Sequence, residues 1–309
     1  MLYVSGSLAY DRIMTFPGHF EEHILPEKLH ILNVCFLIDH IEEKRGGTAG
    51  NIAYNLHLLG ESPFLLSTLG HDYASYAAAL GEQGLCMDGV RIVKEDCTAV
   101  AHITTDQSAN QITGFCPGAM RFSCKYQFSG LNPEKDMAIV APGNLEDMKT
   151  LPEVYRKAHV PFIYDPGQQI TSIPAHDMLD SMNGAAILVA NDYEMEMIRQ
   201  NTGKSMEQIL DMVGAAITTF GEKGCRIEQK GKDAVHVSVF PIKNTADPTG
   251  AGDSFRAGLL KGLSDGYSLP DAARLGAAIA SFCVEKYGTQ EHAPEMKEVL
   301  SRMDAIRIA

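Results

Sequence analysis

The stretch Asn244-Thr-Ala-Asp-Pro-Thr-Gly-Ala-Gly-Asp-Ser-Phe-Arg256 is the most informative segment of the chain. It follows an apolar, strand-like run at 235–240 and leads into an amphipathic helical pattern at 250–263. Gly250 and Gly252 allow a sharp turn and leave backbone N–H groups pointing outward at the start of the helix, where the helix dipole also favours an anion. The segment therefore predicts a site for a phosphate group or an oxyanion.

Asp253 stands at the edge of this predicted anion site. Its charge would repel a bound phosphate, so a carboxylate at this place needs a role of its own. It can accept the proton of an alcohol that attacks phosphorus. Alternatively, it is an ordinary first-turn residue that the helix dipole stabilises, and the motif alone does not decide between the two.

Short apolar, β-rich runs alternate with helical patterns along most of the 309 residues. This alternation is typical of an α/β fold in which helices cover a mostly parallel sheet. The composition, with 45% hydrophobic and 21% charged residues, is that of a folded globular protein. We expect a single domain over residues 1–309, with strands at 2–4, 64–68, 137–140, 162–164, 186–189 and 216–219 and helices at 48–59, 250–263, 269–285 and 294–303.

Two stretches, at about 12–46 and 98–128, interrupt the alternation. The second begins with the strand-like run Thr98-Ala-Val-Ala-His-Ile-Thr-Thr105 and continues with a turn at 106–110. Together the two stretches predict a small antiparallel sheet that acts as a lid at the carboxyl end of the main sheet, where ligands of open α/β sheets bind. Its exposed strand edges could pair with a second copy, so a homodimer formed through the lid is a further expectation.

Charge and cysteine usage exclude several classes of partner. The chain has 26 Lys and Arg against 39 Asp and Glu, and no basic run, so it would repel nucleic acid. No apolar run approaches the roughly 20 residues of a membrane span, and the N-terminus has no signal-peptide pattern. The seven cysteines contain no C-x-x-C pair, which fits reduced thiols. We therefore expect a cytoplasmic protein that binds neither nucleic acid nor membranes.

The segment Asp247–Phe255 resembles the second signature of the ribokinase family, also called the PfkB carbohydrate kinase family. Arg45-Gly-Gly-x-x-x-Asn51 resembles the first signature, and Asp11 follows the first strand as the family's substrate-binding aspartate does. Asn191-Asp-Tyr-Glu194 resembles the family's N-x-x-E motif, and Thr219-Phe-Gly-Glu-Lys-Gly224 its nucleotide-binding turn. The resemblance spans essentially the whole chain and implies a ribokinase-like three-layer α/β sandwich with a small β lid.

The resemblance also implies a role for each matched residue. Asp253 would be the general base, and the backbone N–H groups of Gly250, Ala251, Gly252 and Asp253 would form an anion hole. Glu194 would act on Mg²⁺ through water. The acceptor's hydroxyl groups would contact Asp11, Gly46, Gly47 and Asn51, and ATP would lie along Asn191, Thr219, Gly221 and Gly224. In some members K⁺ binds backbone oxygens near positions equivalent to Asp247, Thr249 and 286–288, so K⁺ is a further candidate cofactor.

Taken singly, these segments have simpler explanations. Gly46-Gly47 could be a plain turn before a helix, while Asn51 and Glu194 could be exposed residues of a first helical turn. Four matches in the family's order favour the functional interpretation over a coincidence of four structural ones.

Three further segments, at 110–113, 165–168 and 280–290, resemble the nucleoside-kinase branch, which includes archaeal nucleoside kinases and bacterial adenosine kinases. The resemblance implies phosphorylation of a nucleoside 5′-hydroxyl by ATP, with adenosine first among the substrates. Gln111 and Gln168 would contact the base or sugar, although surface turns explain them equally well. Packing is likewise the alternative for the apolar candidates for the base pocket, Phe16, Phe36, Phe115, Met120 and Phe122. Gly276 stands where ribokinases often have an Asn near the adenine, so their contacts with that base are not transferred.

Three other functions remain open on the sequence alone. A sugar kinase for ribose or fructose would use the same motifs. A nicotinamide-dependent oxidoreductase would need a third glycine where residue 255 is Phe. A regulator that binds a nucleoside or nucleotide without turnover would keep the fold, although the presence of Asp253 and Glu194 argues against it.

Overall fold

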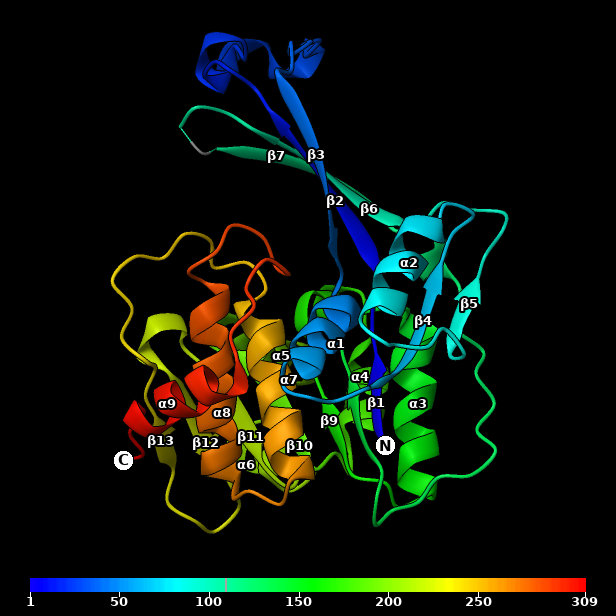
Figure 1. The fold of residues 1–309 in the computed structure, drawn as a ribbon, viewed down its shortest axis with the longest axis vertical. Coiled ribbons are helices and arrows are strands. Elements are labelled where there is room, and N and C mark those ends of the chain that lie inside the picture. The colour runs from blue at the N-terminus through cyan, green and yellow to red at the C-terminus, as the bar shows by residue number, and fades with distance from the viewer. Residues whose placement is uncertain (109) are drawn as a thin grey trace.

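Buried strands form the centre of the molecule. In the computed structural model, which describes residues 1–108 and 110–309, every residue of β1 (Leu2–Ser5), β8 (Met137–Val140) and β9 (Phe162–Tyr164) is buried. Strands that are buried on both faces belong to a sheet covered by helices on both sides. They lie in a sheet of nine strands with the order β13-β12-β11-β10-β9-β8-β1-β4-β5 (Figure 1).

The pairing within this sheet is parallel from β5 to β11 and antiparallel only for β11–β12 and β12–β13. The prediction of a mostly parallel sheet is therefore confirmed. The six expected strands match within two residues, whereas the run at 235–240 is a strand only as far as Val237. The other strands are β4 (Phe64–Leu69), β5 (Val90–Ile92), β10 (Ile187–Asn191), β11 (Ala216–Thr219), β12 (Cys225–Glu228) and β13 (Val235–Val237).

Alternate residues of the strands face two separate hydrophobic cores. In β1, Leu2 and Val4 belong to the first core and Tyr3 to the second, as the twofold period of a strand requires. The four expected helices are confirmed within two residues. The first core is covered by α1 (Thr48–Leu58), α2 (Ala74–Glu82), α7 (Ala251–Ser264), α8 (Leu269–Cys283) and α9 (Met296–Ala305), the second by α3 (Leu145–Lys157), α4 (Ala175–Met182), α5 (Asp192–Thr202) and α6 (Met206–Leu210).

A second sheet, called the small sheet below, consists of β2 (Ala9–Thr15), β3 (His40–Gly46), β6 (Ala99–Thr105) and β7 (Gln111–Cys116) in the order β3-β2-β6-β7. Figure 1 shows that it projects from the body like an arm. Its tip carries the short 3₁₀ helices η1 (Phe20–Glu22) and η2 (Pro26–Ile31). Ala109, in the turn expected at 106–110, lies outside the described residues.

The expectation of an antiparallel small sheet is wrong for one of its three strand pairs. β2–β3 and β6–β7 are antiparallel, but β2–β6 is parallel. The main sheet explains the difference, because β2 follows β1 and β6 follows β5, and the carboxyl ends of these parallel strands lie at one edge. Strands that continue outward from one edge run in the same direction. Within the described part of the chain, no helix is long and apolar enough to cross a membrane.

Candidate active site

An open pocket of about 960 Å³ lies at the carboxyl edge of the main sheet, against the small sheet. Ligands of open α/β sheets bind at this edge. The residues that line it come from β2, β6 and β7 of the small sheet, from α1 and α7, and from the loops after β1, β7, β8, β9 and α8. They include Ser7, Asp11, Asn51, Asp253, Gly143 and Gln168.

The N-terminus of α7 forms one wall of this pocket. Gly250 is its N-cap with a φ of +79°, in the left-handed region that favours glycine. Among the described residues, no acceptor is bonded to the N–H groups of Gly250, Gly252 and Asp253, whereas the N–H of Ala251 donates to the carbonyl of Pro248 over 3.2 Å. Three free donors therefore lie at the positive end of a helix of 14 residues.

The carboxylate of Asp253 reaches the pocket and is held by Asn51. Nδ2 of Asn51 donates to Oδ2 of Asp253 over 2.8 Å, and Nε2 of Gln290 donates to Oδ1 of Asn51 over 3.0 Å. Because Gln290 occupies the amide oxygen of Asn51, the amide nitrogen must face Asp253. Burial raises the pKa of the Asp253 carboxyl, whereas the hydrogen bond from Asn51 and the guanidinium of Arg256 oppose that rise.

The pair Gly46-Gly47 makes room for the pocket wall and for Asp11. A Cβ on Gly46 would lie 2.6 Å from Oδ2 of Asp11. Gly47 has a φ of +84°, and a Cβ there would lie 2.5 Å from the carbonyl oxygen of Ser7. Burial, together with the charge of Asp247, raises the pKa of Asp11 to about 6. Both positions thus require glycine for close approach.

The residues expected near ATP lie at the same edge of the sheet, outside the residues that line the pocket. Asn191 and Glu194 form a capping box at the start of α5: Oδ1 of Asn191 accepts from the Glu194 N–H over 2.7 Å, and Oε2 of Glu194 accepts from the Asn191 N–H over 2.9 Å. Thr219 pairs with Asn191 across β10 and β11. Gly221 begins η5 (Gly221–Lys223), and Gly224 follows it with a φ of +86°. The capping box explains Asn191 and Glu194 by local structure and leaves Oε1 of Glu194 free of protein partners in the described chain.

The structure divides the candidates for the base pocket. Phe115 on β7, Met120 on η3 (Gly118–Arg121) and Gln168 at the start of η4 (Gly167–Thr171) line the pocket. Four others do not. Phe16 and Phe36 pack together at the tip of the small sheet with ring centroids 4.8 Å apart, Phe122 lies beside Arg91, and Gln111 is exposed on β7 opposite Thr105, near the tip.

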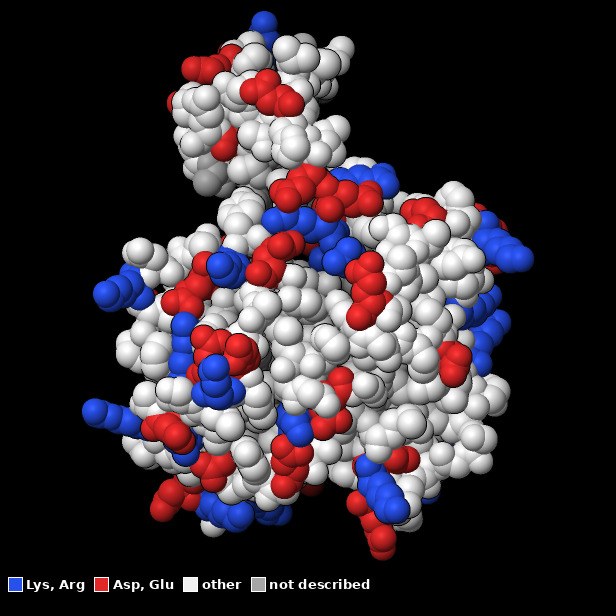
Figure 2. All heavy atoms as spheres, in the orientation of Figure 1, with Lys and Arg blue, Asp and Glu red and all other residues white. Residues whose placement is uncertain are grey.

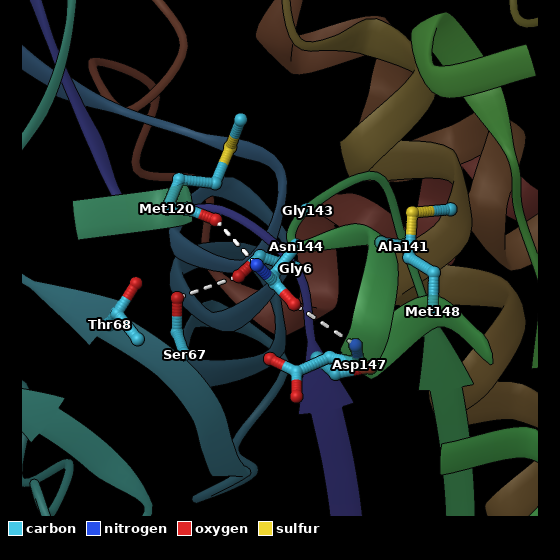
Figure 3. A pocket seen from close by; sticks show the side chains of 10 residues that line it. Gly6, Ser67, Thr68, Met120, Ala141, Gly143, Asn144, Asp147 and Met148 are labelled. Atoms are coloured by element: carbon cyan, nitrogen blue, oxygen red, sulfur yellow. Dashed lines mark hydrogen bonds between the residues drawn. The ribbon is translucent and has the colours of Figure 1, made fainter. Parts of the chain in front are cut away.

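Asn144 is a pocket residue that the sequence reading missed. Its Oδ1 caps α3, and its Nδ2 donates to the carbonyl of Met120 over 2.9 Å (Figure 3). Asn144 also lines a second cavity of only about 10 Å³, room for roughly one water molecule. Figure 3 shows it among the other residues that line this cavity. Asn144 therefore fixes η3, and with it Met120, against the main sheet. The signal available in the sequence was a polar residue just after a buried strand.

Asp247 joins the two loops that the resemblance associates with K⁺. Its Oδ1 accepts from the N–H of Thr249 over 2.9 Å, and its Oδ2 accepts from the N–H of Gly288 over 3.1 Å. The segments around 247–249 and 286–288 are therefore in contact.

Comparisons with known proteins agree with this geometry. A family model described as pfkB family carbohydrate kinase matches residues 23–296. The nucleoside kinase of Methanocaldococcus jannaschii is 32% identical over 288 residues, which is 91% of this chain and 93% of that protein. A solved structure of the Burkholderia thailandensis nucleoside kinase in complex with inosine is 36% identical, covers 99% of this chain and 97% of its own chain, and has a TM-score of 0.86. The structure of the same enzyme in complex with ADP-inosine is 37% identical, covers 99% of this chain and 95% of its own chain, and has a TM-score of 0.84.

These matches extend over the main sheet, the small sheet and the pocket between them. They confirm the expected ribokinase-like fold and the family resemblance. The chain belongs to the pfkB carbohydrate kinase family, whose members are phosphotransferases that act on a hydroxyl group.

Proposed function

We propose that this kinase transfers the γ-phosphoryl group of ATP to the 5′-hydroxyl of a nucleoside, with adenosine as the first candidate. The observation that carries the proposal is the position of Asp253, whose carboxylate reaches the pocket next to the free N–H groups of Gly250 and Gly252. The pocket volume of about 960 Å³ is at the upper end of the range for small-molecule sites. The inosine complexes of the Burkholderia enzyme support the same substrate class.

In this mechanism the acceptor hydroxyl lies between Asp253 and the γ-phosphate. Asp253 accepts the hydroxyl proton as the oxygen attacks phosphorus in line with the leaving ADP. Asn51 holds the carboxylate in one orientation through its 2.8 Å hydrogen bond. The N–H groups of Gly250, Gly252 and Asp253 stabilise the charge on the transferring group, and the N–H of Ala251 joins them when the phosphate replaces the carbonyl of Pro248 as its acceptor.

The ribose and the base occupy opposite sides of the pocket. The Asp11 carboxylate, with Asn51 and the backbone of Gly46 and Gly47, binds the ribose hydroxyls. Phe115 and Met120 form an apolar wall for the flat base, and Gln168 offers its amide to a polar atom of the base or sugar. Gln111, exposed near the tip of the small sheet, is assigned no contact in this open arrangement.

The residues at the nucleotide side fit Mg²⁺-ATP. Mg²⁺ usually keeps several waters and takes one or two carboxylates plus substrate phosphates, so a dedicated cluster is not needed, and the described residues contain no group of three or more metal-binding side chains. The free Oε1 of Glu194 would hold a water of the ion, and Asn191, Thr219, Gly221 and Gly224 would border ATP. When bound, Mg²⁺ neutralises charge on the phosphates. We assign K⁺ to the joined loops at 247–249 and 286–288.

The small sheet acts as the lid in this proposal. Closing it over the pocket excludes water, which would otherwise compete with the nucleoside for the phosphoryl group. Its tip also exposes large apolar side chains: Leu29, Ile31, Leu32 and Leu37 are 57%, 65%, 53% and 81% exposed. Figure 2 shows uncharged surface on the tip between scattered acidic side chains, and charges of both signs over the body. We propose that a second copy covers this tip, giving a homodimer.

A panel of acceptors tests the substrate class. ADP release would be measured with Mg²⁺-ATP and adenosine, inosine, guanosine, cytidine, ribose or fructose. We expect turnover with nucleosides at micromolar concentration and little with free sugars, because a sugar leaves the Phe115–Met120 wall without contacts. Saturation by a free sugar alone would make the chain a sugar kinase, and binding without turnover of any acceptor would make it a regulator.

A further inference from the structure

A buried ion pair lies beneath the first turn of α7, and the mechanism above does not use it. Arg256 is 7% exposed and Asp165, which directly follows β9, is 1% exposed. Nη2 of Arg256 donates to Oδ1 of Asp165 over 2.9 Å, and Nε of the same guanidinium is in contact with Oδ2. A buried pair adds little net stability, because the cost of removing both charges from water offsets their attraction. Its place next to the proposed base therefore points to a role in the reaction.

The guanidinium occupies the space under the backbone of the anion site. Helical side chains point back toward the N-terminus, and a Cβ on Gly252 would lie 2.6 Å from Nη1 of Arg256. Gly252 has no positive φ, so this position requires the absence of a side chain and not an unusual backbone. Asp253 is the next residue and lies three positions before Arg256, on the same side of the helix.

Arg256 is the cation in a group of carboxylates from three elements. Asp165 follows β9, Asp253 belongs to α7 and Glu194 to α5. For Asp253, the Arg256 charge favours the ionised form and the Glu194 charge opposes it. Burial raises the pKa of Asp165 to about 6 against the effect of Arg256, with Glu194 and Asp253 adding to the rise.

Two uncharged groups also lie close to Asp253. Asn51 from α1 donates the 2.8 Å hydrogen bond. The Cys283 thiol from α8 also interacts with the charge of Asp253, and burial raises the pKa of this thiol to about 11. Neither group supplies the positive charge that a partly desolvated carboxylate needs if it is to stay ionised.

We propose that Arg256, held in place by Asp165 beneath the first turn of α7, is a positioning residue whose charge keeps the Asp253 carboxylate, oriented by Asn51, ready to accept the hydroxyl proton. The proposal rests on the proposed function, since it takes Asp253 as the base. Arg256 does not touch the substrate; it acts through Asp253. Asp165 fixes the guanidinium of Arg256 and partly neutralises its charge. Arg256 and Asp165 therefore have opposite effects on the ionisation of Asp253.

The dependence of kcat on pH, measured with saturating nucleoside and Mg²⁺-ATP, tests this directly. In Arg256→Met the acid limb, the low-pH side of the kcat profile on which Asp253 becomes protonated, should move to higher pH by about one unit or more. The reason is that the Asp253 carboxylate loses the nearby positive charge. In Asp165→Asn the limb should move to lower pH, because the Arg256 charge is no longer balanced. Arg256→Lys should restore the wild-type limb while keeping a reduced kcat, since Lys supplies the charge without the two-pronged geometry.

A purely structural role predicts a different outcome. Arg256→Met and Asp165→Asn would then lose activity by a constant factor at every pH. The proposal would be overturned if the acid limbs of these two variants stay in place or move in the same direction. Arg274→Met is the matched control, because this half-buried arginine of α8 pairs with Asp271 and the carbonyl of Met303. Its limb should coincide with that of the wild type. If Arg256→Met does not fold, two variants still test the proposal: the acid limb of Arg256→Lys should stay at the wild-type pH, whereas that of Asp165→Asn should move to lower pH.

A readout without turnover separates this proposal from the proposed function. In protein with ¹³C-labelled aspartate, the Asp253 carboxyl signal is identified by its loss in Asp253→Asn and titrated in each variant. Its pKa should rise in Arg256→Met and fall in Asp165→Asn. An unmoved pKa overturns the role of Arg256 even if Asp253 is the base. If the Asp253 pKa shifts as expected but Asp253→Asn is fully active, the proposed function is overturned. Only the electrostatic coupling between Arg256 and Asp253 then remains.

Discussion

Asp11, which we propose binds the ribose hydroxyls, would make substrate binding depend on pH. It is half-buried next to Gly46, and burial together with the Asp247 charge raises its pKa to about 6. Only the ionised form can accept hydrogen bonds at both oxygens from ribose hydroxyls. The affinity for nucleoside should therefore be highest well above pH 6 and should weaken as the pH falls through 6.

We expect the dissociation constant of the nucleoside, measured without ATP, to rise about tenfold for each pH unit below 6. Asp11→Asn mimics the protonated carboxyl, so its dissociation constant should be high and nearly independent of pH. Glu43→Gln on β3 is a matched control, because this exposed carboxylate pairs with Arg12 on the same sheet. A wild-type constant that stays flat down to about pH 5 would remove Asp11 from the ribose site.

The sequence predicted single residues well where a local motif defined them. Gly46, Gly47 and Gly250 all occupy positions at which a Cβ would collide with neighbouring atoms, and their spacing in the motifs had identified them. Arg256 was missed because its partner Asp165 is 91 positions away in the chain. The one sign of its importance in the sequence was that an arginine stands within an otherwise apolar part of a helix.

The segment 286–292 connects α8 with α1 and the small sheet. Nζ of Lys44 on β3 donates to the carbonyl of Tyr287, and Gln290 holds Asn51. His292 is 1% exposed; its Nε2 donates to Oδ1 of Asn55, while its Nδ1 has no partner among the described residues. The orientation of Asn51 toward Asp253 therefore depends on the docking of this segment on α1.

Acid should weaken this docking. Burial lowers the pKa of His292 from 6.5 to about 4, so the unfolded chain binds a proton that the folded chain does not. The contribution of neutral His292 to the free energy of unfolding is therefore complete above pH 6.5 and is lost as the pH falls toward 4. Between pH 7 and 5 the loss should be about 2 kcal/mol of unfolding free energy, measured by urea denaturation. His292→Gln, which keeps a donor for Asn55, should remove that part of the pH dependence, and an identical dependence in both proteins would contradict the assignment.

Whole elements were predicted where hydrophobic periodicity was strong, as in β8 and α7. The mutual arrangement of β2 and β6 was not, because their parallel pairing follows from the direction in which two distant strands leave the main sheet. The packing of Phe16 against Phe36 at the tip was not predicted either, because the two rings come from opposite ends of the segment between β2 and β3. Such long-range contacts leave no pattern in the neighbouring sequence.

The molecule as a whole combines a body built on the main sheet with a projecting small sheet (Figure 1), and the tip of the small sheet exposes Leu29, Ile31, Leu32 and Leu37. Exposed aliphatic residues on a projecting arm are costly in water unless something covers them. We expect a dimer by sedimentation at micromolar concentration. Ile31→Lys and Leu37→Lys should weaken it by about tenfold or more, as for the loss of central interface contacts.

Leu300→Lys on α9 is the matched control for these changes, since Leu300 is exposed on the body and not on the tip. It should leave the sedimentation coefficient unchanged. A monomeric wild type, or a dimer that only the Leu300 change disrupts, would move the interface away from the small sheet.

The central claim is that Asp253 takes the proton from a nucleoside hydroxyl, and one comparison tests it most directly. ADP release would be measured with Mg²⁺-ATP and adenosine for the wild type, for Asp253→Asn and for Asp265→Asn. Asp265 is a control at the other end of α7, where its carboxylate pairs with Lys261. We predict that Asp253→Asn binds ATP normally and turns over at least about 100-fold more slowly, as loss of a general base requires, while Asp265→Asn behaves as the wild type. Near-normal turnover by Asp253→Asn would contradict the account.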